Sequence, residues 1–186
     1  MGKALIIGCG GVGSVAIHKC VENSEIFNEI CIASRNIEKC NAIKSKLDGK
    51  TSTRISTAQV DANDVGALVN LIEDFKPDVV MHLALPYQNL TIMEACLRTK
   101  VNYLDTANYE SEDIPQFSYK EQWALNDKFK AANITALLGS GFDPGVTGVF
   151  TAYAMKHQFD TIETIDVLDC NAGDHGYPFA TNFNPE

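Results

Sequence analysis

Closely spaced glycines near the start of the chain suit phosphate binding. The segment GCGGVG (residues 8–13) has the G-x-G-x-x-G spacing, follows the apolar run 3–8 and opens a stretch of helical periodicity. In that setting the first glycine permits a tight turn, the second lets backbone approach a pyrophosphate, and the third allows close helix packing. The helix N-terminus would offer free N–H groups to the phosphates. The motif predicts a dinucleotide-binding loop, with a turn that serves only packing as the alternative; its residues are Gly8, Gly10, Gly11, Val12 and Gly13.

The end of the second apolar run, residues 29–34, indicates which dinucleotide binds. An acidic residue there would accept hydrogen bonds from the ribose hydroxyls of NAD and would repel a 2′-phosphate. Here the run ends in a hydroxyl, a guanidinium and an amide, from Ser34, Arg35 and Asn36. Arg35 can form bidentate, charge-assisted hydrogen bonds with a phosphate. The sequence therefore predicts NADP(H), with a solvated charge at a strand end as the alternative for Arg35.

Two later strand ends carry further candidates. Asp61 ends the predicted strand 54–62, where it would contact the adenine or cap the following helix; the sequence does not choose between the two. The run 78–85 stops at a proline and would lie beside the dinucleotide. Its candidate cofactor contacts are Ala84, Leu85 and Pro86. His82 is flanked by apolar residues, which favours a buried structural histidine over a catalytic one.

The elements that would position these residues alternate between strand and helix. Predicted strands are 3–8, 29–34, 54–62, 78–85, 101–107 and 134–139, and predicted helices are 12–23, 36–47, 63–75, 89–99 and 119–133. Strands that are apolar on both faces indicate a parallel sheet covered by helices. Short connections with right-handed crossovers predict an α/β fold, a Rossmann-type doubly wound parallel sheet.

The pattern changes after residue 145. A predicted helix at 149–157 precedes residues 161–170, which alternate like a strand. The remaining residues are predicted to form a loop. We therefore expect an NADP-binding Rossmann domain over residues 1–145, and the beginning of an incomplete α+β substrate domain over residues 146–186.

Composition narrows the class of protein. The 186 residues suit one complete domain and part of another. A net charge of -9 argues against non-specific nucleic-acid binding, which depends on basic patches. No membrane span or signal peptide is predicted, so a cytoplasmic location is expected. The six cysteines form no C-x-x-C pair or Cys/His cluster, so we expect reduced thiols and no metal site.

The segments GCGGVG, ASRN, LPYQN, VNYLDTANYE and LLGSGFDPGVTGVF together resemble the saccharopine dehydrogenase-like reductases, and within them most the carboxynorspermidine dehydrogenases. The last two segments are the most specific, and the similarity runs from residue 3 onward. The resemblance implies an NADP-dependent oxidoreductase of the opine type, in which an amine and an aldehyde form an imine that NADPH reduces. It implies aspartate β-semialdehyde with 1,3-diaminopropane or putrescine as substrates, carboxynorspermidine or carboxyspermidine as the product in polyamine biosynthesis, and a homodimer for the full-length form.

The same resemblance implies three catalytic candidates. Tyr109 matches a tyrosine near the reaction centre, and its phenol could protonate the imine nitrogen. Asp143 precedes a proline in a predicted helix start, where it is either a plain N-cap or a group that orients the amine or relays a proton. Cys170 could hydrogen-bond the imine, with an inert buried thiol as the alternative.

Other functions stay open at this point. Members of the family are much longer than this chain, so we expect it to carry mainly the cofactor half and to lack turnover alone, because catalysis requires closure that excludes water. The alternatives are a saccharopine dehydrogenase of lysine metabolism and a non-catalytic dinucleotide-binding module. A short-chain dehydrogenase is disfavoured, because Trp123 rather than lysine stands four residues after Tyr119.

Overall fold

The computed structural model describes residues 2–111 and 118–168. A six-stranded parallel sheet has the order β3-β2-β1-β4-β5-β6. Its strands are β1 (Gly2–Ile7), β2 (Phe27–Ser34), β3 (Arg54–Gln59), β4 (Val79–His82), β5 (Asn102–Asp105) and β6 (Ala136–Leu137). The strand order reverses between β1 and β4, which opens a crevice at the carboxyl ends of these strands. The predicted doubly wound fold is confirmed.

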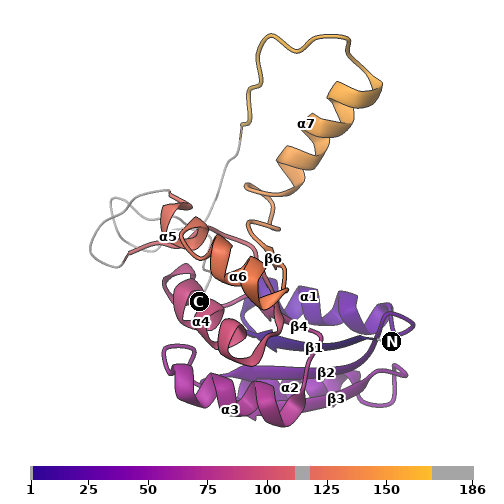
Figure 1. The fold of residues 1–186 in the computed structure, drawn as a ribbon. Coiled ribbons are helices and arrows are strands. Elements are labelled where there is room, and N and C mark those ends of the chain that lie inside the picture. The colour runs from indigo at the N-terminus through magenta and orange to yellow at the C-terminus, as the bar shows by residue number, and fades with distance from the viewer. Residues whose placement is uncertain (1, 112–117, 169–186) are drawn as a thin grey trace, which may run out of the picture.

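Helices cover both faces of the sheet (Figure 1). They are α1 (Gly11–Glu22), α2 (Ile37–Leu47), α3 (Val65–Phe75), η1 (Pro86–Gln88), α4 (Asn89–Thr99), α5 (Lys120–Trp123), α6 (Asn126–Ala132) and α7 (Val146–His157). In β1, Leu5 and Ile7 face the core formed with α3, α4 and α6, whereas Ala4 and Ile6 face the core formed with α1 and α2. This alternation explains why the strand is apolar throughout.

The described cysteines are free and buried: Cys9, Cys20, Cys31, Cys40 and Cys96. Burial raises the pKa of Cys40 to about 12, which keeps its thiol protonated at neutral pH. The burial of these five residues agrees with the expectation of small apolar side chains, and their reduced state stays a prediction. Cys170 lies outside the described residues.

Two predicted elements differ from the structure. The helix expected over 119–133 is divided into α5 and α6, with a break at Ala124 and Leu125. The strand expected over 161–170 is wrong for its described part, because residues 161–168 form no helix or strand. A strand needs a neighbouring edge to receive its backbone hydrogen bonds, and no described strand pairs with this segment.

Helix α7 projects away from the sheet (Figure 1), and none of its residues is buried. Its exposed large apolar side chains are Val149, Phe150, Tyr153 and Met155. An apolar helix surface of this kind is normally covered by another element. Residues 146–168 therefore differ from the sheet domain in packing.

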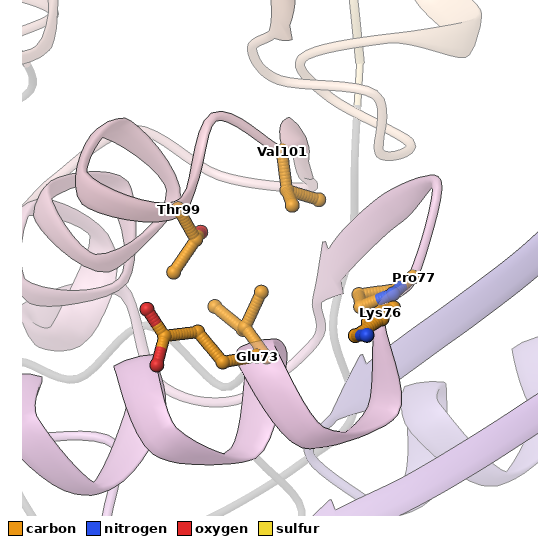
Figure 2. Close-up of a pocket in the computed structure, with 6 residues that line it drawn as sticks. Glu73, Lys76, Pro77, Thr99 and Val101 are labelled. Carbon is orange, nitrogen blue, oxygen red and sulfur yellow. The ribbon is translucent and has the colours of Figure 1, made fainter.

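A hollow of about 300 Å³ lies near the amino ends of β4 and β5, between α3 and α4 (Figure 2). Glu73, Lys76, Pro77, Thr99 and Val101 line it together with Ile72. None of the predicted site residues lines this hollow, so it is separate from the candidate site. Within the described residues, no helix has the length and apolar character needed to cross a membrane.

Candidate cofactor-binding site

The turn from β1 into α1 requires two of its glycines for steric reasons. Gly8 has a φ of +104°, and a Cβ on it would lie 2.5 Å from the backbone nitrogen of Ala84. A Cβ on Gly13 would overlap the carbonyl oxygen of Gly8, so α1 packs directly on the turn. Neither position accepts a side chain without displacing backbone. These contacts also bring the turn against the segment that follows β4.

The N-terminus of α1 is open to a ligand. Gly10 is exposed at the N-cap position without a side-chain cap, and a Cβ on it would meet nothing within 4 Å. The first turn of α1, which includes exposed Gly11 and Val12, contains no acidic residue. Free N–H groups at the positive end of a helix dipole attract anions. The turn thus combines open space with the electrostatics that a pyrophosphate needs.

The residues after β2 are held by hydrogen bonds that leave one cation unpaired. The Ser34 Oγ accepts from the Asn36 backbone nitrogen at 3.3 Å, and the Asn36 side chain caps α2 by accepting from the Lys39 nitrogen at 3.1 Å. The Gln59 side chain donates to the Arg35 carbonyl oxygen at 3.0 Å. The Arg35 side chain is exposed and forms no ion pair in the described part of the chain. Its guanidinium is therefore available to a phosphate.

The helix-cap alternative for Asp61 is wrong. Asp64 caps α3, because its Oδ1 accepts from the Ala67 nitrogen at 3.0 Å. Asp61 is exposed after β3, and its Oδ1 accepts from the Asn63 nitrogen at 3.0 Å within the turn that precedes the helix. A contact between Asp61 and adenine stays a prediction.

The segment after β4 lies beside the glycine turn, and a contact of Ala84, Leu85 and Pro86 with the cofactor stays a prediction. Ala84 and its neighbour Leu83 contact Gly8, Leu85 precedes η1, and Pro86 begins η1. All of these residues after β4 are partly buried. The carboxyl end of β4 therefore forms one wall of the crevice at the point where strand order reverses.

His82 ends β4 and is 2% exposed. Its Nε2 lies 2.8 Å from the Asn89 Oδ1, and because the Asn89 amide nitrogen donates elsewhere, Nε2 carries the proton. Burial lowers the pKa of His82 to about 4, so the ring is neutral at pH 7. The geometry agrees with the buried histidine that the sequence favoured.

Asp105, at the end of β5, is the centre of a buried hydrogen-bond network that no sequence motif reveals. Its Oδ1 accepts from the Gly139 nitrogen at 2.6 Å, and its Oδ2 accepts from the Tyr103 hydroxyl at 2.9 Å. Oδ2 also accepts from the side-chain amides of Gln122 at 2.6 Å and Asn89 at 3.2 Å. Burial raises the pKa of Asp105, while the bonds from Gly139, Tyr103 and Gln122 oppose that rise. In the sequence, Asp105 stands within the predicted strand 101–107 and within the segment VNYLDTANYE, but neither shows the partners of its carboxylate.

Two catalytic candidates lie on loops near this network. Tyr109 is partly buried, and its backbone nitrogen donates to the Gln122 Oε1 at 2.8 Å. Asp143 is exposed, and its Oδ1 accepts from the Thr147 hydroxyl at 3.1 Å. No hydrogen bond in the described part of the chain joins the side chains of Tyr109 and Asp143. The third candidate, Cys170, falls outside that part.

The prediction that Asp143 is the N-cap of a helix is wrong. Helix α7 begins at Val146 with Gly145 at the N-cap position. The Gly141 nitrogen donates to the Pro144 carbonyl at 3.0 Å, and the Val146 nitrogen donates to the Gly141 carbonyl at 3.0 Å. These bonds close a tight turn before the helix. A side chain on Gly145 would overlap the backbone of Gly141, and its φ of +133° favours glycine.

Comparison with known proteins identifies the family. Residues 4–137 match the model of the saccharopine dehydrogenase NADP binding domain, and the chain belongs to this family. The chain is 55% identical over 186 residues to carboxyaminopropylagmatine dehydrogenase from Synechocystis sp., covering 100% of this chain and 46% of the relative. It is 50% identical over 192 residues to carboxynorspermidine synthase from Vibrio cholerae, covering 98% of this chain and 46% of the relative. The chain thus spans about half the length of these curated relatives.

Solved structures agree on the fold. Apo saccharopine dehydrogenase (L-Glu forming) from Saccharomyces cerevisiae superimposes with a TM-score of 0.67 at 20% identity, over 84% of this chain and 31% of that chain. UDP-glucose 4-epimerase from Thermotoga maritima superimposes with a TM-score of 0.52 at 14% identity, over 83% of this chain and 63% of that chain. At these identities the likeness concerns the fold alone. The family model confirms the NADP(H) prediction, and together with the curated relatives it confirms the resemblance drawn from the sequence.

Proposed function

We propose that this chain is the NADPH-binding part of an oxidoreductase that reduces an imine to a secondary amine. The observation that carries the proposal is the exposed Arg35 directly after β2, which forms no ion pair among the described residues, together with the open N-terminus of α1 after the neighbouring strand β1. A phosphate on the adenosine ribose would meet the guanidinium, and the pyrophosphate would meet the amides after Gly10. Bound NADPH would supply the hydride.

The residues at the carboxyl edge of the sheet fit this cofactor. Open space at Gly10 lets a pyrophosphate approach the backbone, and Gly8 and Gly13 hold the turn close to β4. Ser34, Arg35 and Asn36 would bind the phosphorylated ribose. The backbone of 84–86 would lie beside the middle of the dinucleotide, at the reversal of strand order.

The substrate class comes from the relatives. Their names describe a carboxyaminopropylagmatine dehydrogenase and a carboxynorspermidine synthase. We infer an imine formed from aspartate β-semialdehyde and a primary amine such as a diamine, with saccharopine formation as the alternative. Tyr109 is the proposed proton donor to the imine nitrogen, and Asp143 would orient the amine. The exposed apolar side chains of α7 support a second unit that begins near residue 146.

The test is a fluorescence titration of this chain with NADPH and with NADH. We expect NADPH to bind at least about tenfold more tightly, which corresponds to about 1.4 kcal/mol. Arg35→Gln should remove most of this preference while leaving NADH binding unchanged. Arg54→Gln is a matched control, because Arg54 is also exposed but lies at the amino end of β3, paired with Glu29 at 2.7 Å.

The outcomes separate the parts of the proposal. Equal affinities for the two cofactors would refute the role of Arg35 and leave the dinucleotide fold standing. A folded chain that binds neither cofactor would refute the proposed function itself. If Arg54→Gln lowered the preference as much as Arg35→Gln, the effect would be one of overall charge rather than of a site.

A further inference from the structure

We propose that Asp105 is a positioning residue for the nicotinamide half of the cofactor, an inference that rests on the proposed function. A Rossmann fold binds a dinucleotide across the reversal of strand order, with one half of the ligand over each half of the sheet. Arg35 at the end of β2 marks the adenosine half. The nicotinamide half then lies over the carboxyl ends of β4 and β5, where Asp105 is 1% exposed.

The Asp105 carboxylate connects the segments that would form that half of the site. Through Oδ1 it holds the backbone nitrogen of Gly139, the first residue of the 139–145 loop, at 2.6 Å. Through Oδ2 it holds Gln122 at 2.6 Å, and the other end of the Gln122 amide accepts from the Tyr109 nitrogen at 2.8 Å. One carboxylate thus fixes both loops that carry the proposed catalytic residues.

The same carboxylate also reaches β4. Asn89 donates to Asp105 at 3.2 Å and to the Ala107 carbonyl at 2.8 Å, and its oxygen accepts from His82. The end of β4, the end of β5 and both loops therefore share one set of hydrogen bonds. A shift at Asp105 would move several parts of the surface together, because each bond constrains the next.

The network requires that both side-chain oxygens of Asp105 accept hydrogen bonds. Among the described residues, the four partners of its side chain all donate to it, and it forms no ion pair. An asparagine of the same size would replace one acceptor oxygen by a donor N–H₂ group. That group would face either the Gly139 amide or the three donors at Oδ2. The substitution therefore releases one side of the network while keeping the volume.

Packing around Gly139 leaves little room for an alternative arrangement. Gly139 has a φ of +63°, and a Cβ on it would overlap the Tyr119 hydroxyl. Burial raises the pKa of Tyr119, so this hydroxyl stays protonated beside the loop at neutral pH. With its anchor at Asp105 removed, the loop would leave this close contact rather than tighten it.

The experiment compares two ligands by calorimetry: NADPH, and 2′-phospho-ADP-ribose, which lacks the nicotinamide. We expect Asp105→Asn to weaken NADPH binding at least about tenfold, while the affinity for 2′-phospho-ADP-ribose changes by less than about twofold. A residue that only supports the fold would lower both affinities together. The ratio of the two affinities is therefore the decisive measurement.

Matched variants keep the test decisive. Thr53→Val removes a hydrogen bond of another buried polar residue, from the Thr53 hydroxyl to the Phe27 carbonyl at 2.7 Å. This bond lies at the opposite end of the sheet, so the affinity ratio should be unchanged. If Asp105→Asn does not fold, Gln122→Met decides, because it keeps the carboxylate but cuts the link to Tyr109. Gln122→Met should lower the affinity for NADPH about threefold and leave the affinity for 2′-phospho-ADP-ribose unchanged.

Equal losses for both ligands, or no loss for either, would overturn the inference. A wild-type chain that binds neither ligand would instead overturn the proposed function. In a third outcome, the wild-type chain binds 2′-phospho-ADP-ribose, but the ratio of the two affinities is unchanged in Asp105→Asn and in Gln122→Met. The cofactor site would then stand, and only the role of Asp105 would be refuted.

Discussion

The two halves of the sheet present different surfaces at their carboxyl edge. The half formed by β1, β2 and β3 ends in exposed groups, including the backbone of Gly10 and the side chains of Arg35 and Asn36. The half formed by β4, β5 and β6 ends in buried polar groups, of which Asp105 and His82 are 1% and 2% exposed. The first half can contact a ligand directly, whereas the second shapes the loops above it.

Because of this difference, substitutions in the two halves should affect ligand affinity and the free energy of unfolding to different extents. An exposed side chain contributes little to the folded state, so its removal changes affinity more than the free energy of unfolding. A buried hydrogen-bonded group contributes to both, because an unpaired partner left behind costs about 1–3 kcal/mol. Substitutions in the two halves should therefore have distinguishable effects.

The largest effect is expected at Gly8, where the two halves touch. Gly8→Ala should lower the free energy of unfolding by about 2–5 kcal/mol, because it adds the cost of a positive φ to a collision with the backbone of Ala84. NADPH binding should be lost with it. Urea denaturation and the fluorescence titration measure the two quantities.

Gly10→Ala is the matched control for that substitution. Its Cβ would meet nothing within 4 Å, and its φ of -73° suits any residue. We expect the free energy of unfolding to change by less than about 0.5 kcal/mol, while NADPH affinity falls at least about tenfold. If Gly10→Ala bound NADPH normally, the pyrophosphate would not approach the backbone at this residue.

A smaller effect, confined to acid, is expected at His82. Burial lowers its pKa to about 4 in the folded chain, against about 6.5 for an unfolded histidine. Between these values the unfolded chain binds more protons, so the free energy of unfolding falls as pH is lowered from 6.5 to 4. The loss amounts to about 3 kcal/mol at most, at 1.36 kcal/mol per pH unit.

His82→Gln isolates this contribution. The glutamine amide can still donate to Asn89 but does not titrate in this range. The difference in unfolding free energy between wild type and variant should stay constant above about pH 7 and change by up to about 3 kcal/mol between pH 6.5 and 4. A constant difference over the whole range would mean that His82 is not buried as a neutral ring.

The candidates in the exposed half of the site come from local sequence patterns, whereas the buried hydrogen-bond network does not. The glycine spacing and the run Ser34-Arg35-Asn36 are local patterns, and each depends on residues that are close in the chain. The Asp105 network brings together Asn89, Tyr103, Gln122 and Gly139 from separate elements. No spacing in the sequence encodes such a set, because only the packed fold brings its members together.

Errors in the predicted elements have the same origin. Asp143-Pro144 has the residue types of a helix start, but the hydrogen bonds between Gly141 and Val146 shift the start of α7 to Val146. Residues 161–168 alternate like a strand, but alternation describes faces and does not supply a pairing edge. The core strands were predicted well because their apolar runs carry the burial that forms them.

The smallest effect is expected at Asp61, an exposed residue after β3. Among the described residues its side chain bonds only the nearby Asn63 nitrogen, so Asp61→Ala should change the free energy of unfolding by less than about 0.5 kcal/mol. Asp64→Ala, which removes the cap of α3, should cost about 1 kcal/mol and serves as the control. If Asp61 contacts adenine, Asp61→Ala should lower the affinity for NADPH about threefold, whereas Asp64→Ala should leave that affinity unchanged. Equal NADPH affinity in wild type and Asp61→Ala would leave Asp61 as a turn residue and confine the specificity of this half to the residues after β2.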